Sequence, residues 1–300
     1  MKPSVSAVIP TLGRPSLTCA VQSVLDQTYP VDEILVVADG DISPALPPDD
    51  RIMLLSNGVR GSAARSRQLG IDAARGTVIA LLDDDDEWHP AKLQRQLESV
   101  DVAAGGYWIA SSRMAVLGPG DRRRIWPRRL IAPGESLAEY LFRCRGLRVG
   151  GATLQTSTLC FPAELVREVP WAADVDGAHD EPGWLIRAQR AIPQLRVIQL
   201  PDVLSTYNVD GASVSRSVTD RTDEYIEWGL RFLSTESPRV LGDYLCTSPV
   251  SAAVHARSLA GVRRAVWSAL RHGRPGPFAL AYAALNSARI VARRAGSAIR

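Results

Sequence analysis

Short apolar runs alternate with helical patterns through the first 90 residues, and this alternation constrains the fold more than any other feature. Each run has the length of a strand that is buried on both faces. The runs lie at 4–9, 33–38, 51–55 and 78–82. Helical patterns begin near Leu17 and near Ser62. Helical crossovers between such strands imply a parallel, doubly wound α/β sheet.

Five consecutive acids, Asp83–Glu87, directly follow the last of these runs, and Trp88 and Pro90 close the stretch. Carboxylates crowded at a strand end repel one another, and a hard cation among them relieves that repulsion. The carboxyl edge of an α/β sheet is also where ligands bind. The alternative is a solvated acidic turn. The position after a core strand favours a metal site that holds phosphate.

The other predicted strands also end in polar residues, with Thr11 and Arg14 after the first and Asp39 after the second. Loops at this edge should converge on one crevice. Arg60, Arg65 and Arg67 lie at or near the start of the next helix, where an anion is favoured; the alternative is a solvated helix face. The sequence has neither GxGxxG nor GxxxxGK[ST], so the usual dinucleotide and P-loop fingerprints are missing.

Three later segments carry weaker signals. Asp180 and Glu181 precede an apolar helical stretch, either as functional acids or as an N-terminal acidic cap. The arginines of 122–129 are interpreted as a solvated loop, with an acidic substrate or partner as the alternative. Residues 150–161 read as a glycine turn that enters a threonine-rich strand, whose hydroxyls would suit a polyol.

The four cysteines are scattered without CxxC spacing, which argues against a disulfide scaffold and a zinc site and fits a reducing cytoplasm. A strand-like segment begins within four residues of the N-terminus, leaving no room for a signal peptide. No stretch approaches 18 uninterrupted apolar residues. We therefore expect a cytoplasmic protein.

Charge is divided unevenly along the chain. Residues 251–300 contain nine arginines and no Asp, Glu or Lys, so the rest of this +3 chain carries −6. The acidic body and the lack of a binding module argue against nucleic acid. A basic amphipathic tail suits peripheral contact with anionic lipid at the inner face of a membrane; the alternative is a helix packed back on the protein.

Several motifs together resemble family 2 glycosyltransferases of the GT-A fold. The segments that carry the resemblance are Val5–Thr11, Ser23–Tyr29, Glu33–Gly40, Ser62–Gly70, Asp83–Pro90, 155–160 and 179–187. The match covers about residues 1–215. The resemblance implies a Rossmann-like mixed, mostly parallel sheet flanked by helices in a catalytic domain at 1–217, and we expect a helical, arginine-rich extension at 218–300.

The resemblance implies an enzyme of hexosyltransferase type that moves a sugar, with inversion, from a UDP- or dTDP-sugar to an acceptor hydroxyl. The acceptor would be a saccharide, a lipid carrier or a small molecule. Asp83 and Asp85 match the Asp-x-Asp pair that holds Mg²⁺ or Mn²⁺ on the donor diphosphate. The expected donor-binding residues are Pro10, Thr11 and Arg14 in the nucleoside loop, Asp39 at the pyrimidine N–H, Arg65 near the diphosphate, Asp83 and Asp84.

Glu181 falls on the position of the family's catalytic base, where the family usually has Asp. Asp180 lies within reach and is the alternative base. Two other functions stay open from the residues alone. One is a sugar nucleotidyltransferase of related fold, for which Gly13 and Arg14 are a weak echo of the glycine-rich loop. The other is a membrane-surface binding protein that acts through its basic tail.

Overall fold

The computed structural model describes residues 2–58, 60–100, 102, 105–118, 120, 122–146, 148–172, 179–209 and 220–298, with side chains up to Ala292. The chain divides into two compact units. The first comprises Met1–Glu135, Ala152–Val175 and Asp180–Gly211, and the second comprises Ser136–Gly151, Asp176–His179 and Ala212–Arg300. The predicted boundary between residues 217 and 218 lies outside the described residues.

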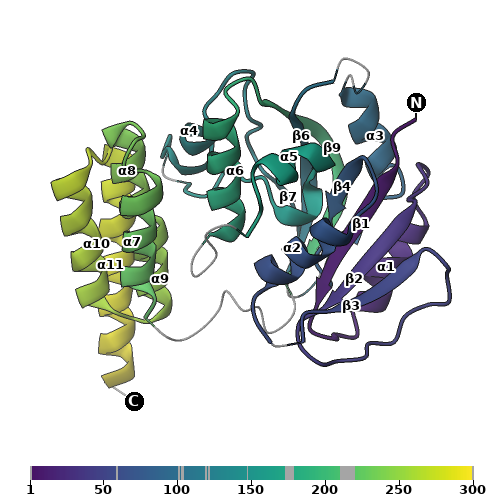
Figure 1. Ribbon diagram of the computed structural model, residues 1–300. Coiled ribbons are helices and arrows are strands. Elements are labelled where there is room, and N and C mark those ends of the chain that lie inside the picture. Colours follow the sequence, from purple (N-terminus) through teal and green to yellow (C-terminus); the bar gives the residue numbers. More distant parts are fainter. Residues whose placement is uncertain are drawn as a thin grey trace. The chain divides into compact units, whose positions relative to one another are not determined.

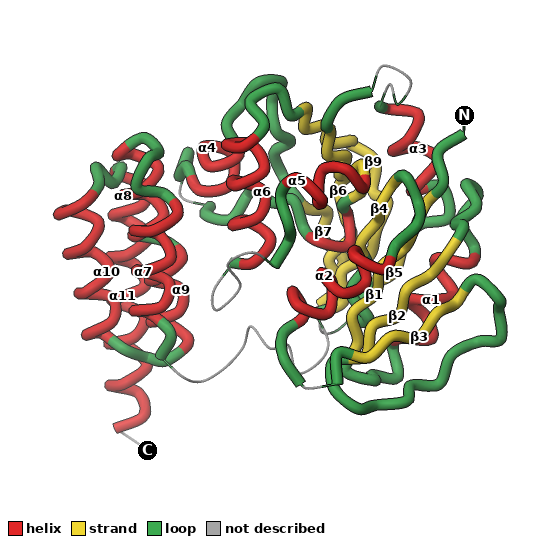
Figure 2. The backbone as a smooth tube through the Cα atoms, viewed as in Figure 1, coloured by secondary structure: helices red, strands yellow, loops and turns green. Residues whose placement is uncertain are grey.

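A mixed sheet forms the centre of the first unit (Figures 1 and 2). Its described strands are β1 (Val5–Thr11), β2 (Glu33–Ala38), β3 (Ile52–Ser56), β4 (Val78–Leu81), β5 (Glu87–Trp88), β6 (Trp108–Gly118), β7 (Arg122–Trp126), β8 (Cys160–Pro162) and β9 (Arg196–Asn208). The order is β3-β2-β1-β4-β8-β6-β9-β5, with β7 paired to β6. Strands β3, β2, β1 and β4 are parallel to one another, as are β6 and β9, whereas β8, β5 and β7 pair antiparallel. The predicted α/β sheet is confirmed.

Helices flank this sheet. They are α1 (Leu17–Leu25), α2 (Ala63–Ala73), α3 (Lys92–Ser99), α5 (Ala163–Glu168) and α6 (Asp180–Ala191). Every residue of β1 and β4 is buried, because helical crossovers cover a parallel sheet on both faces. Helix α2 packs closely on β1 and β2 at Gly70, where a Cβ would lie 2.5 Å from Val8 Cγ1 and 2.9 Å from Val37 Cγ2. Only glycine allows α2 to approach the strands this closely.

Two segments differ from our expectations. Residues Arg122–Trp126, which we interpreted as a solvated loop, form strand β7 at the side of β6, and their side chains stay exposed except for the half-buried Trp126. The threonine-rich segment forms a 3-10 turn, Thr156–Thr158, before the short strand β8. The Gln155 side chain caps this turn by accepting from the backbone N–H of Ser157 at 2.8 Å, and such local bonds compete with strand pairing.

The described part of the second unit is helical, as the sequence after residue 220 predicts. Its helices are α4 (Leu137–Phe142), α7 (Thr222–Phe232), α8 (Pro238–Leu245), α9 (Ser248–His255), α10 (Leu259–His272) and α11 (Pro277–Ala298). Helices α9, α10 and α11 form a small core of Val250, Ala253, Val262, Ala265, Ala283 and Ile290. Within the described ranges, each helix is too short or too polar to cross a bilayer.

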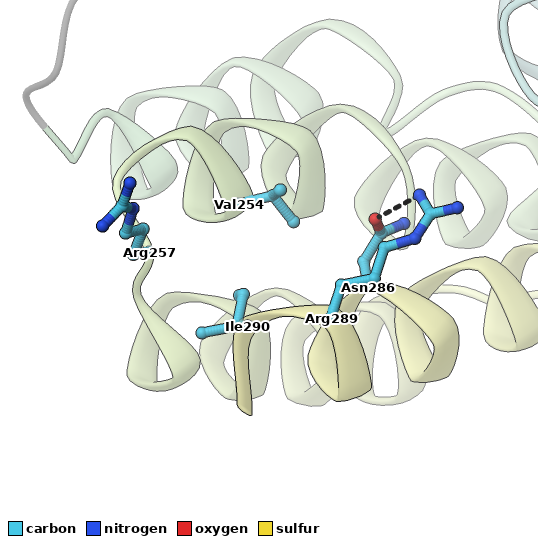
Figure 3. Close-up of a pocket in the computed structure, with 5 residues that line it drawn as sticks. All are labelled: Val254, Arg257, Asn286, Arg289 and Ile290. Carbon is cyan, nitrogen blue, oxygen red and sulfur yellow. Dashed lines mark hydrogen bonds between the residues drawn. The ribbon is translucent and has the colours of Figure 1, made fainter. Parts of the chain in front are cut away.

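A pocket in the second unit lies between the end of α9 and α11 (Figure 3). It is lined by Val254, Arg257, Asn286, Arg289 and Ile290, and Arg289 donates to Asn286 Oδ1 at 3.4 Å. None of the predicted site residues lines this pocket. The chemistry suggested by the sequence therefore has to be sought in the first unit.

Candidate active site

Three parallel strands end at one edge of the sheet in the first unit. Strand β1 lies between β2 and β4, with Thr11 opposite Ala38 and Val8 opposite Leu81. The residues that follow β2 and β4 are Asp39 and the acid run, so the topology brings both beside the loop after β1. The predicted convergence of polar residues at this edge follows from that register.

Asp84 holds the loop that follows β1. Thr11 Oγ1 and the Leu12 backbone N–H both donate to Asp84 Oδ2, at 2.7 and 3.1 Å. Arg14 Nη1 donates to Asp84 Oδ1 at 2.9 Å and to Asp85 Oδ2 at 2.7 Å. Asp84 is only 4% exposed, so this residue, which we expect to bind the donor, lies beneath the loop that carries Thr11 and Arg14.

Asp39 is fixed by the chain on its other side. Its Oδ1 accepts from Asn57 Nδ2 at 2.6 Å and from the Gly61 backbone N–H at 2.8 Å. Its Oδ2 has no hydrogen-bond partner among the residues that the structure describes, although Asp39 is only 8% exposed. One carboxylate oxygen is therefore held rigidly and the other can accept from a ligand. Pro10, also expected near the nucleoside, is buried within β1.

Arg67 connects the acid run to the start of α6. Its Nη2 donates to Asp83 Oδ1 at 2.5 Å and its Nη1 donates to Asp180 Oδ2 at 2.8 Å. Arg67 is 5% exposed, and the two carboxylates raise the pKa of its guanidinium against the effect of burial. Arg65, which we expect at the diphosphate, lies two residues before Arg67 in α2 and is exposed. The arginine that joins the acids is Arg67, which sequence reasoning did not separate from its neighbours.

The Thr156–Thr158 turn contacts both groups of acids. Ser157 Oγ donates to Asp86 Oδ2 at 2.6 Å and accepts from the Asp83 backbone N–H at 3.0 Å. Thr156 Oγ1 donates to Glu181 Oε2 at 2.6 Å. The turn thus sits between the end of β4 and the start of α6, and the hydroxyls of Thr156 and Ser157 bind protein carboxylates.

The acid run alternates between buried and accessible members. The side chains of Asp83 and Asp85 are 23% and 34% exposed, whereas that of Asp84 is 6% exposed and Asp86 as a residue is buried. Burial and the charge of Asp83 raise the pKa of Asp85, and the same two causes hold the pKa of Asp86 well above its ordinary value. Concentrated negative charge at this edge is therefore only partly balanced by Arg14 and Arg67.

Glu181 lies at the start of α6 and is half-buried. Burial is the main cause that raises the pKa of Glu181 to about 8. The hydrogen bond from Thr156 opposes this shift, the charges of Asp180 and Asp83 add to it, and the charge of Arg67 opposes it. Asp180 differs because its carboxylate is already bound to Arg67. Of the two candidate bases, Glu181 has the pKa of a proton acceptor poised near neutral pH.

The predicted cation ligands Asp83 and Asp85 lie on the accessible side of the run. Among the described ranges, no group of three or more His, Cys, Asp or Glu is arranged to hold a metal ion. Two neighbouring carboxylates nevertheless fit Mg²⁺ or Mn²⁺ when substrate phosphates and waters complete the coordination. Asp83 and Asp85 would be the ligands that the protein supplies to such a cation.

The structure brings together Thr11, Arg14, Asp83, Asp84, Asp85, Asp180 and Glu181 through the contacts above. Asn57 was not among the predicted site residues; Arg67 was named only with its neighbouring arginines, and Thr156 and Ser157 only as hydroxyls for a polyol. A signal for Arg67 was present, since it shares the buried face of α2 with Ala64, Gly70 and Ile71, where an arginine needs a buried partner. The hydroxyls of Thr156 and Ser157 were expected to suit a polyol, whereas they bond to the carboxylates of Glu181 and Asp86.

Comparisons with known proteins agree with the resemblance. The profile of glycosyl transferase family 2 matches residues 6–142. The amylovoran biosynthesis glycosyltransferase AmsB of Erwinia amylovora is 26% identical over 252 residues, which cover 79% of each chain. The Escherichia coli protein WfgD, named as a UDP-Glc:α-D-GlcNAc-diphosphoundecaprenol β-1,3-glucosyltransferase, is 32% identical over 124 residues, which cover 37% of this chain and 49% of that relative.

A solved structure supports the fold. The crystal structure of TarS 1-349 from S. aureus in complex with UDP-GlcNAc superposes with a TM-score of 0.59 at 15% identity, over 89% of this chain and 79% of that one. At this identity the similarity establishes architecture alone. With the family profile and the curated relatives, it shows that the chain is an enzyme, a glycosyltransferase with a family 2 domain over residues 6–142 and the GT-A fold.

Proposed function

We propose that this enzyme moves a sugar from a pyrimidine nucleoside-diphosphate donor, UDP- or dTDP-linked, to an acceptor hydroxyl with inversion at the anomeric carbon. The observation that carries the proposal is the bridge through Arg67, which joins Asp83 of the acid pair to Asp180 beside Glu181. The acids that would hold a cation on the donor diphosphate and the carboxylate that would act as the base therefore belong to one hydrogen-bonded cluster. The names of WfgD and of the TarS complex, both with UDP-sugars, support a uridine donor.

Each residue then has a defined task. Asp39 Oδ2 accepts the ring N–H of the pyrimidine, and the loop of Thr11 and Arg14 borders the nucleoside. Glu181 takes the proton from the acceptor hydroxyl, whose oxygen attacks the anomeric carbon while the bond from that carbon to the diphosphate oxygen breaks. The nucleoside diphosphate leaves with the bonding electron pair.

Asp83 and Asp85 are the residues that would hold Mg²⁺ or Mn²⁺. When bound there, the cation supplies positive charge that stabilises the leaving diphosphate. Charge crowding supports this assignment: burial is the main cause that raises the pKa of Asp85, and the charges of Asp83 and Asp84 add to it against Arg14. Arg67 orients Asp83 and Asp180 and remains protonated throughout.

A thermal-shift series tests the donor and the cation together. We expect UDP or dTDP to stabilise the protein with Mn²⁺, by about 2.7 kcal/mol at a hundredfold excess over Kd, and to lose that effect with EDTA. Asp85→Ala should abolish the metal-dependent stabilisation, whereas the control Asp72→Ala, an exposed acid on α2, should keep it. Equal stabilisation by purine diphosphates would overturn the pyrimidine assignment, and equal stabilisation in EDTA would overturn the cation.

The products separate this function from a sugar nucleotidyltransferase. Incubation with UDP-GlcNAc or UDP-glucose should release UDP, by transfer or slow hydrolysis. Release of pyrophosphate from UTP and a sugar phosphate would instead establish the nucleotidyltransferase. The acceptor classes named above, saccharide, lipid carrier and small molecule, all supply the hydroxyl that Glu181 deprotonates.

The second unit favours contact with an anionic membrane as an accessory function. Trp267, Leu270 and Leu285 on α10 and α11 are 59%, 61% and 57% exposed, and Arg271 lies over the Trp267 ring at 5.1 Å. Exposed apolar side chains beside arginines, in a segment that carries +9, suit a bilayer with anionic headgroups at the inner face of the membrane. A cytoplasmic protein would meet that face.

Vesicle co-sedimentation tests this contact. Wild-type protein should pellet with phosphatidylglycerol-containing vesicles and much less with phosphatidylcholine alone. The double substitution Trp267→Ala with Leu270→Ala should reduce pelleting. The control Met53→Ala, at an exposed apolar residue on β3, should not. Equal pelleting of wild type and the double variant would remove the proposal.

A further inference from the structure

Lys92 is a buried cation that the proposed mechanism does not use. It is the first residue of α3 and is 0% exposed. A positive charge at a helix N-terminus opposes the helix dipole, and burial of an ammonium group without a carboxylate is costly. No carboxylate forms an ion pair with Lys92 among the described residues, and burial lowers the pKa of Lys92 to about 8. Because this position is unfavourable for a charged side chain, we looked for a role of Lys92 in its contacts.

The ammonium group of Lys92 makes two contacts inside the first unit. Its Nζ donates to Gln96 Oε1 at 2.8 Å and lies 4.2 Å from the centre of the Trp88 ring. Because an ammonium group can only donate, Lys92 fixes which end of the Gln96 amide faces it. The amide nitrogen of Gln96 must then point the other way, where it donates to Thr158 O at 2.7 Å.

Trp88 anchors the neighbouring carbonyl of the same turn. Its Nε1 donates to Ser157 O at 2.8 Å. The two residues that Lys92 contacts therefore hold consecutive carbonyl groups, those of Ser157 and Thr158, from behind the turn. The front of the turn presents Ser157 Oγ to Asp83 and Asp86, and Thr156 Oγ1 to Glu181.

We propose that Lys92 is a positioning residue for the transfer reaction: through Trp88 and Gln96 it holds the Thr156–Thr158 turn so that its hydroxyls meet the acid run and Glu181. Lys92 touches neither donor nor acceptor. It acts on catalysis by fixing the carboxylates that do, and this part rests on the proposed function of those carboxylates.

The chain offers a matched control, because it contains only two lysines. Lys2 is exposed and also lies over an aromatic ring, that of Tyr29 at 4.4 Å. Lys92→Met keeps the length and apolar stem of the side chain and removes the donor. Lys2→Met makes the same change at the surface.

Hydrogen–deuterium exchange of the full chain reads the turn directly and does not depend on activity. In K92M, peptides that cover 155–159 and 83–86 should exchange faster than in wild type, while those of β1 and β2 should not; K2M should match wild type throughout. Unchanged exchange of the turn in folded K92M would overturn the proposal. If the wild-type protein released no UDP, the proposed function would be wrong, but the exchange of the turn in K92M could still be compared with that in wild type.

Steady-state kinetics with UDP-GlcNAc and UDP-glucose as donor probes give the second readout. We expect kcat to fall by about 10- to 100-fold in K92M, as for a small displacement of catalytic groups, while the donor KM changes by less than about threefold. If K92M lost kcat, donor binding and thermal stability together, Lys92 would be a packing residue and the proposal would be overturned.

Trp88→Phe is the second variant: alone it tests the turn if K92M does not fold, and if K92M folds the two changes are also combined. It keeps an aromatic ring for Lys92 and removes only the N–H that binds Ser157 O. It should show faster turn exchange and lower kcat, and the double variant should lose little more than one single variant, because both act through one turn. Full additivity in the double variant, or wild-type exchange in folded W88F, would contradict the shared route.

Discussion

Replacing Thr156 with valine should move the pH dependence of the reaction upward. The Thr156 hydroxyl donates to Glu181 at 2.6 Å and favours the charged carboxylate, so it opposes the burial that raises the pKa of Glu181 to about 8. Valine has nearly the same shape and cannot donate. The pKa of Glu181 should therefore rise further, because the charges of Asp180 and Asp83 remain and Arg67 alone opposes them.

The size of the shift follows from the strength of that bond. A hydrogen bond to a charged group contributes about 1.5–3 kcal/mol, and about 1.4 kcal/mol corresponds to one pKa unit. Because Glu181 is half-buried, we take the lower end, a rise of about one unit. A general base must be deprotonated, so kcat/KM should increase with pH up to the pKa and then level off.

At pH 7, the deprotonated fraction of Glu181 should fall from roughly a tenth to roughly a hundredth, and kcat/KM should fall about tenfold. Above about pH 9.5 the variant should regain most of the wild-type rate. The measurement is UDP release from UDP-GlcNAc and UDP-glucose between pH 6 and 10. Thr28→Val, at an exposed hydroxyl near the end of α1, is the control and should follow the wild-type profile. An unshifted or lowered profile in T156V would refute Glu181 as the base.

Two further substitutions test the frame of the site by urea unfolding. Arg67→Gln leaves Asp83 and Asp180 without their shared cation and should destabilise the protein by about 3 kcal/mol, the low end for a broken buried pair because both acids are partly exposed; a loss under about 1 kcal/mol would mean that the bridge is weak. Gly70→Ala places a Cβ 2.5 Å from Val8 Cγ1 and should cost about 1–3 kcal/mol, whereas Gly118→Ala, whose Cβ would meet only Arg122 O at 3.9 Å, should cost less. Equal stability of the two glycine variants would contradict the close packing of α2.

The part of the site that rests on strand ends could be predicted from the sequence. Continuous apolar runs identify β1, β2 and β4, because burial on both faces leaves a local composition signal. Crossover helices make these strands parallel, so their carboxyl ends share an edge whatever the details of the loops. Thr11, Asp39 and Asp83 were therefore placed together by topology, before any contact was known.

The part that depends on the far half of the chain was less predictable. The bond from Thr156 to Glu181 joins a turn and a helix that are local neither to each other nor to β4. The turn itself has the composition of a strand, and local bonds of Gln155 and Thr158 favour the turn instead. Arg67 and Arg65 lie two residues apart on one helix, and the choice between them requires knowing which face of α2 covers the sheet.

The alternation along the acid run explains why four aspartates follow β4 where two would serve a cation. The run forms a turn, closed by the Asp86 backbone N–H donating to Asp83 O at 3.1 Å, and within it buried side chains alternate with accessible ones. Asp84 and Asp86 are the inward members. Asp84 accepts hydrogen bonds from the loop after β1, and Asp86 accepts them from Ser157 and Gln155. Asp83 and Asp85 are the outward members, which leaves them accessible to a ligand.

The inward pair thus ties the outward pair to both sides of the site. Asp84 fixes the run to the loop that borders the nucleoside, and Asp86 fixes it to the turn that contacts Glu181. The result is a concentration of negative charge that Arg14 and Arg67 only partly balance; burial first, and then the charge of Asp83, raise the pKa of Asp85. A bound cation would complete that balance. The same crowding that makes the run unfavourable in isolation is what would make a cation and its diphosphate bind.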